Sequence, residues 1–144
     1  LGEKKDRVDD ALHATRAAIE EGIVIGGGSA LAHCAMRLSR VFQDSEEDQL
    51  GQDIVMNAIT SPLRQISENA GKNGDEIIIA VQAGMAPLYP IEYYGYDVAK
   101  AKYGNLIDMG VIDPAKVTKS AVQNAASVSG ILLTTECVIA DSKE

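Results

Sequence analysis

The spacing of apolar residues constrains the fold of this chain more than any other feature. Apolar side chains that recur every three or four positions predict amphipathic helices. Gly22 is expected to end the first helix, and the triplet Gly26–Gly28 separates it from the second. The 144 residues suffice for one compact domain, or for part of one. The expected helices cover residues 3–21, 29–42, 50–66 and 114–132.

Three features modify this helical pattern. Pro62 lies inside the third helix and lacks a backbone N–H, which predicts a kink or break near Ser61. Residues 75–82 contain three successive isoleucines that suit a strand, whereas their flanks suit a helix; a helix is favoured. From Gly84 to Gly110, prolines, glycines and tyrosines replace the helical spacing, so this stretch predicts turns and a small hairpin whose tyrosines pack locally.

The C-terminal quarter combines a helix with an isolated strand. Asp113 and Pro114 suit the N-cap and the first residue of the last helix, and the small residues of that helix predict close packing. Residues 136–140 suit a strand, but the sequence offers it no obvious partner. That strand is therefore expected to pair outside this sequence.

Composition excludes several classes of function. The net charge of -8 argues against nucleic acids or anionic membranes as partners, and no apolar run approaches the roughly 18 residues that span a bilayer. Cys34 and Cys137 stand in apolar contexts, which predicts buried free thiols rather than a disulfide. His13 and His33 have no other ligand at a recognised spacing, so both are expected in packing or surface roles, and no metal site is predicted.

The sequence contains six distinctive blocks, at residues 3–22, 26–28, 62–66, 103–114, 116–121 and 134–137. These blocks resemble the group I chaperonins, the GroEL family, in that family's order and over nearly all of the 144 residues. Two positions depart from the family pattern: Asp97 stands where Asn is usual, and Val98 where Ala is usual. Residues 72–94 also differ from the shorter glycine-rich turn of the family.

The resemblance implies a mainly α fold. Residues 1–21 would be an intermediate-domain helix, and residues 22–144 the C-terminal part of an equatorial domain, a helical bundle with a small β-hairpin and a C-terminal strand. Leu1 stands in mid-helix in place of a Met, which suggests a piece of a longer protein. The N-terminal equatorial half and the apical domain would then lie outside it.

The resemblance also implies an ATP site. Asp10 matches the aspartate that orients the attacking water, although pattern alone favours an exposed helix carboxylate. The glycine triplet matches glycines that contact the nucleotide, although pattern alone favours a flexible connection. Asp113 matches the carboxylate that binds the ribose hydroxyls, although pattern alone favours a helix cap. The implied ATP-binding residues are Gly26, Gly27, Tyr96, Asp97, Val98, Ala99, Val111 and Asp113.

The remaining expectations concern cofactor and partners. The cofactor would be ATP with Mg²⁺, but the phosphate loop and the Asp-Gly-Thr-Thr-Thr stretch that hold the phosphates and the metal in the family do not occur in this sequence. The 144 residues alone are therefore expected not to turn over ATP. Implied partners are other subunits of a homo-oligomeric double ring, a GroES-type co-chaperonin and unfolded clients, in the bacterial cytoplasm or, as second choice, an organelle matrix. The alternative is a non-enzymatic helical interaction module derived from a chaperonin.

Overall fold

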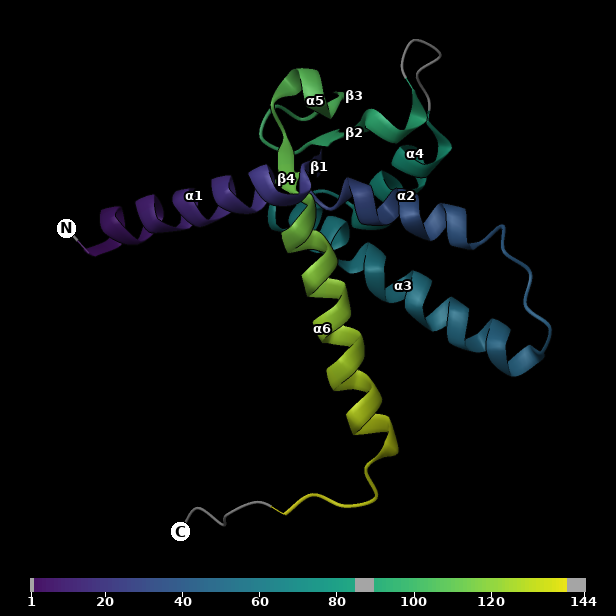
Figure 1. Ribbon diagram of the computed structural model, residues 1–144. Coiled ribbons are helices and arrows are strands. Elements are labelled where there is room, and N and C mark those ends of the chain that lie inside the picture. Colours follow the sequence, from purple (N-terminus) through teal and green to yellow (C-terminus); the bar gives the residue numbers. More distant parts are fainter. Residues whose placement is uncertain (1, 85–89, 140–144) are drawn as a thin grey trace.

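The computed structural model describes residues 2–84 and 90–139. Its elements radiate from one junction, where α1, α6 and the α2–α3 pair point in different directions (Figure 1). The fold is mainly α with a small hairpin, as predicted. The elements in sequence order are α1 (Gly2–Glu21), β1 (Ile23–Ile25), α2 (Ser29–Leu38), α3 (Glu46–Asn69), α4 (Gly74–Ala83), the 3₁₀ turn η1 (Ile91–Tyr93), β2 (Tyr94–Asp97), β3 (Lys102–Asn105), α5 (Leu106–Met109), β4 (Ile112–Pro114) and α6 (Ala115–Thr134).

The core lies where α2, α3 and α4 pack against one another and against β2. Gly28 precedes α2 with a φ of +78°, and a Cβ at this position would lie 2.6 Å from the backbone nitrogen of Leu63 on α3. The two helices therefore meet at the backbone, which only glycine permits. The buried hydrophobic cluster consists of Ala32, Leu63, Ile77, Ile78, Val81 and Tyr96.

Helix α3 is continuous from Glu46 to Asn69, so the break predicted near Ser61 is wrong. Pro62 is exposed, and its ring therefore projects toward solvent. The hydroxyls of Thr60 and Ser61 donate to the carbonyl of Asn57 at 2.9 and 3.5 Å, which supplies hydrogen bonds next to the missing N–H. Tertiary packing of the following Leu63 outweighs the local preference of proline.

The predicted helix over residues 75–82 and the predicted hairpin are both confirmed. The side chain of Asn73 accepts hydrogen bonds from the first amides of α4 and so begins that helix. In the hairpin, β2 pairs antiparallel with β3, and Tyr103 packs against both Tyr94 and Tyr96, with ring centroids 6.1 and 4.7 Å away. Burial raises the pKa of the Tyr94 hydroxyl. The expected differences from the family over residues 85–89 lie outside the described residues.

A second two-stranded ladder joins distant parts of the sequence. Strand β1 pairs antiparallel with β4, so that Val24 lies opposite Asp113. The prediction that Asp113 is the N-cap of the last helix is therefore wrong. Pro114 occupies that position, and no side chain caps the helix there. The physical reason is that residues 112–114 stay extended to pair with β1, and the amide of Ala115 still donates to the carbonyl of Gly22 at 3.0 Å.

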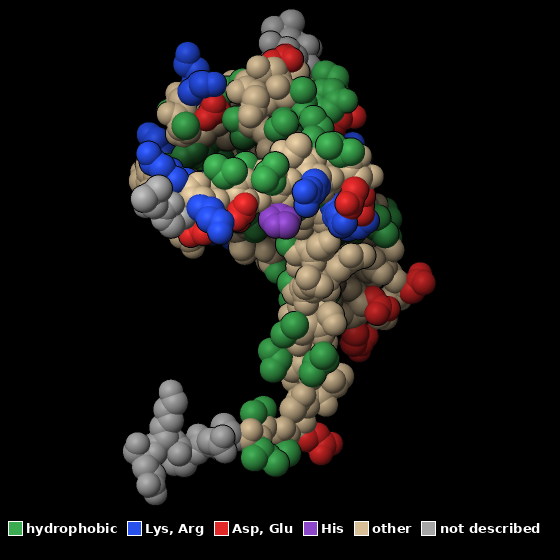
Figure 2. Space-filling view, turned by 60° about the vertical axis from the view of Figure 1, so that its left-hand side comes forward, with side chains coloured by type: hydrophobic (Ala, Val, Ile, Leu, Met, Phe, Trp, Pro, Cys, Tyr) green, Lys and Arg blue, Asp and Glu red, His purple; other side chains and the backbone are tan. Residues whose placement is uncertain are grey.

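The last helix and the residues after it are largely exposed. No described residue of α6 is buried, and hydrophobic side groups line the part that projects from the junction (Figure 2). Residues 136–139 pair with no strand among the described residues, so the strand expected there to pair outside this sequence stays a prediction; Ala140 lies outside the described residues. Cys34 and Cys137 are free, as predicted, but exposed rather than buried. In the described ranges, no helix is long and apolar enough to cross a membrane.

Candidate nucleotide site

The first component of the candidate site is the contact between Gly26 and β4. The amide of Gly26 donates to the carbonyl of Val111 at 2.9 Å. A Cβ at position 26 would lie 3.2 Å from backbone atoms of Val111 and Ile112. This distance is tighter than ordinary packing allows, so a side chain here would push the glycine loop away from β4.

Gly27 brings the hairpin to the same place. Its φ is +63°, and a Cβ on it would lie 3.8 Å from the carbonyl oxygen of Tyr96 and 3.9 Å from a methyl group of Val111. Within the described part of the protein, the N–H groups of Gly27 and Gly28 donate no hydrogen bond. These donors precede the N-terminus of the ten-residue helix α2, which is the arrangement that suits an anionic ligand.

Asp113 adds a carboxylate to this junction. In the β1–β4 ladder, Asp113 pairs with Val24, and the preceding residue Ile112 pairs with Ile25. Among the described residues, the Asp113 side chain makes no hydrogen bond and no ion pair, and it is only partly buried. A carboxylate accepts hydrogen bonds only, so it suits a pair of hydroxyl donors.

Asp97 is the last residue of β2, and its side chain is buried. Its Oδ1 accepts hydrogen bonds from the amides of Ala99 at 3.0 Å and Lys100 at 3.2 Å, and Lys100 Nζ lies 3.4 Å from Oδ2. Burial of this carboxyl acts to raise its pKa, but the hydrogen bonds and positive charge of Lys100 and the amide of Ala99 outweigh it, so the pKa of Asp97 is lowered. Val98 packs partly against the core, and Ala99 is exposed.

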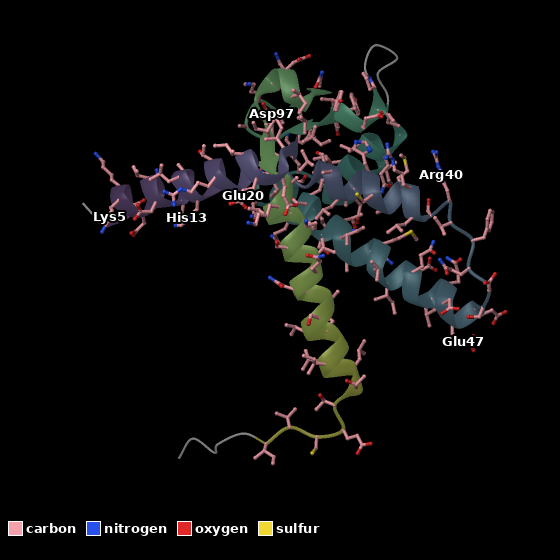
Figure 3. The ribbon with its side chains drawn as sticks, in the orientation of Figure 1. Lys5, His13, Glu20, Arg40, Glu47 and Asp97 are labelled. Atoms are coloured by element: carbon pink, nitrogen blue, oxygen red, sulfur yellow. The ribbon has the colours of Figure 1, made fainter. Side chains whose placement is uncertain are left out.

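Asp10 lies apart from these residues. It stands on the exposed arm formed by α1, about 18 Å from Gly22 at the helical rise of 1.5 Å per residue. Figure 3 shows this arm leaving the junction near Glu20, with Asp97 on the hairpin beyond it. Asp10 lines an open groove between α1 and α6 together with His13, Ala17, Lys116, Ser120 and Asn124. The structure therefore does not bring Asp10 to the glycine loop.

Two ion pairs hold the end of α1 against the start of α6. Lys116 bonds to Glu20, and Lys119 bonds to Glu21. The hydrogen bond from Lys116 to Glu20, and the negative charge of that carboxylate, raise the pKa of Lys116. These pairs join the base of the arm that carries Asp10 to the start of α6.

Two residues near the site were missed by sequence reasoning about function. A Cβ on Gly95 would lie 2.4 Å from Leu106 Cδ1 and 2.6 Å from Ser29 Oγ, so β2 can approach α2 only at a glycine. His33 is buried, and its Nε2 donates to the carbonyl of Tyr94 at 2.7 Å, which ties α2 to the hairpin. A packing or surface role was predicted for His33, and the structure shows packing. A glycine inside a strand pattern is the signal that could have identified Gly95.

The structure thus gathers most of the predicted nucleotide residues at one junction of glycine loop, hairpin and β4. Within residues 2–84 and 90–139, no group of three or more His, Cys, Asp or Glu residues could hold a metal ion.

The model of the TCP-1/cpn60 chaperonin family matches residues 1–143. The protein belongs to the TCP-1/cpn60 chaperonin family, and its function therefore lies in chaperonin-type protein folding.

Proposed function

We propose that this protein is part of a group I chaperonin subunit that hydrolyses ATP to assist the folding of other proteins inside a double ring. Residues 1–21 would belong to its intermediate domain and residues 22–144 to its equatorial domain. The observation that carries the proposal is the junction of Gly26, Gly27, Tyr96 and Val111. Asp113, opposite Val24 in the adjoining β1–β4 ladder, carries a carboxylate that no described residue pairs.

The chemistry of the junction fits the nucleoside of ATP and a phosphate group attached to it. The N–H groups of Gly27 and Gly28 can donate to a phosphate oxygen, and Asp113 can accept from the ribose hydroxyls. The turn that begins with Tyr96, Asp97, Val98 and Ala99 would border the base. No described cluster here suits Mg²⁺, so the metal and the remaining phosphate contacts would come from the N-terminal half that the resemblance implies.

Asp10 would act in hydrolysis rather than in binding. A carboxylate that orients water and accepts its proton can raise the rate of phosphoryl transfer by roughly 10²–10⁴. Because α1 holds Asp10 about 18 Å along the helix from Gly22, the arm would have to take a different direction to bring it to the nucleotide. These residues alone should therefore not hydrolyse ATP.

The exposed surface of α6 supports an assembled state. No described residue of α6 is buried, and the exposed fractions of four large apolar side chains are 58–87%. Such an apolar surface is expected to be covered by another surface. The four residues are Val128, Ile131, Leu132 and Leu133. We propose the N-terminal half of the subunit and neighbouring subunits as that cover. A GroES-type co-chaperonin and unfolded clients would bind through an apical domain, in the bacterial cytoplasm or an organelle matrix.

The test is ATP binding by calorimetry and ATP hydrolysis, measured on this protein alone and after mixing with a separately produced N-terminal half. Binding and turnover are expected only in the mixture. Asp10→Ala should lower turnover at least a hundredfold, on the order expected for loss of a general base, and leave ATP affinity unchanged, because Asp10 acts on the water. Asp9→Ala, a neighbouring exposed carboxylate, is the matched control and should keep full turnover.

Two results would contradict the proposal. Tight ATP binding by the isolated protein would mean that the site needs no second half. No binding in either sample would leave the non-enzymatic interaction module as the better account, since that module needs the exposed surface of α6 but no nucleotide.

A further inference from the structure

The turn that joins β2 to β3 is held from inside by one carboxylate. Asp97 is 4% exposed, and its two oxygens meet three donors, all from Ala99 and Lys100. Oδ1 takes both backbone amides and Oδ2 faces the Lys100 ammonium. The Asp97 carboxylate is therefore committed to the turn itself.

The backbone shape of this turn needs such support. Ala101 has a φ of +51°, a left-handed conformation that is unfavourable for a residue with a Cβ. The turn has to close between Asp97 and Lys102, which pair across the hairpin. The contacts of Asp97 act on the residues just before Ala101 and so hold the backbone of Val98 and Ala99 in place.

The position of this backbone matters because the preceding residue reaches the glycine loop. The carbonyl of Tyr96 lies 3.8 Å from a Cβ built on Gly27, so any ligand on that loop lies beside the start of the turn. The Tyr96 ring is buried and packs on Tyr103, which fixes one end of the turn. Asp97, the next residue, holds the inside of the turn through Ala99 and Lys100.

We propose that Asp97 is a positioning residue for the base of the nucleotide: it sets the backbone of Val98 and Ala99 against the base and makes no contact with the base itself. This inference rests on the proposed function. Adenine offers one N–H donor group and ring-nitrogen acceptors on its edge, which backbone carbonyl and N–H groups can pair. Recognition of the base would then depend on the turn backbone rather than on the chemistry of the residue at position 97.

The conservative variant Asp97→Asn distinguishes positioning of the turn from direct contact with the base. Its amide oxygen can still accept from the amides of Ala99 and Lys100, so the turn should persist. In the assembled protein, this variant is expected to keep ATP affinity and the ratio of ATP to GTP affinity within about threefold. Asp97→Ala removes both backbone hydrogen bonds and should lose roughly tenfold or more in ATP affinity, given about 1 kcal/mol for each bond. Asp108→Asn, an exposed carboxylate on α5, is the matched control and should change neither.

A second readout needs no nucleotide. Hydrogen exchange in the peptide that contains Ala99 and Lys100 should be slow in the unaltered protein and in Asp97→Asn, and fast in Asp97→Ala. The urea midpoint of each variant shows whether the fold as a whole has changed. Because the expected rescue by Asn concerns affinity, exchange and base preference together, a general loss of stability cannot imitate it.

The outcomes distinguish the inference from the proposed function. If the unaltered protein binds ATP and Asp97→Asn changes the ATP-to-GTP ratio by about tenfold or more in either direction, the residue at position 97 touches the base and the inference is wrong. If exchange of the Ala99 and Lys100 amides is equally fast in all variants, the carboxylate does not hold the turn. If the unaltered assembly binds no ATP, the proposed site fails, and the inference fails with it.

Discussion

Gly28→Ala tests the close contact between α2 and α3 on which the glycine loop depends. A Cβ at position 28 would lie 2.6 Å from the nitrogen and 2.9 Å from the Cα of Leu63, and real Cβ atoms essentially never approach other atoms that closely. Leu63 is fully buried, so its backbone cannot move aside without displacing the core. The two helices would have to separate.

The expected cost has two parts. Alanine at a φ of +78° costs about 1–2 kcal/mol, and overpacking of a tight interior costs about 1–3 kcal/mol more. The variant should therefore lose about 2–5 kcal/mol of unfolding free energy. This is a large fraction of the roughly 5–15 kcal/mol that stabilises an ordinary domain.

Gly110→Ala is the matched control for this change. Gly110 has a φ of +75°, but nothing lies within 4 Å of a Cβ built there, so only the conformational part of about 1–2 kcal/mol applies. The assay is urea denaturation followed by far-ultraviolet circular dichroism, which measures the unfolding free energy of each variant. Equal losses in the two variants would refute the reasoning, because they would show that the contact with Leu63 adds nothing.

Three further perturbations have defined outcomes. Ala101→Gly should stabilise the protein by about 0.5 kcal/mol in the same urea assay, since relief of the left-handed conformation exceeds the added flexibility of the unfolded state; a loss would contradict this. The lowered pKa of Asp97 means that its stabilising effect is present above pH 3.8 and disappears as the pH falls through the folded-state value, so unfolding scans of Asp97→Asn and the unaltered protein should converge in acid. The raised pKa of Lys116 means that its contribution to folding stability is present below pH 10.5 and is lost as the pH rises through the folded-state value. Glu20→Gln should remove this loss of stability at alkaline pH, and an unchanged pH profile would exclude the ion pair as its cause.

Helical spacing predicted α1, α2, α3 and α6 because each is local, but it did not predict which face of α2 is buried. Cys34 was expected to be buried but is exposed, whereas the buried residues of α2 are Ser29, Ala32, His33 and Ala35. Backbone contact at Gly28 leaves room on that face mainly for small residues. Burial there follows from tertiary proximity rather than from hydrophobicity.

The errors at Pro62 and Asp113 have a common origin in long-range contacts. Local rules favoured a break at the proline and a cap at the aspartate, yet packing of α3 and pairing of β4 with β1 replaced both. The candidate site was predicted by resemblance to a family and not by pattern. Its gathering at one junction could not be derived from sequence, because the segments come from distant parts of the protein.

The pairing of β1 with β4 also has a consequence for how the protein folds. Val24 and Asp113 meet only after nearly all of the intervening residues have been arranged, and closing so long a loop costs more conformational entropy than forming the local contacts of α2 with α3 or of β2 with β3. We therefore expect the helical hairpin and the β-hairpin to form first and this ladder last. A nascent polypeptide would then gain the junction around Gly26 only once residues near 113 have been synthesised, so competence to bind a ligand there would report that folding is complete.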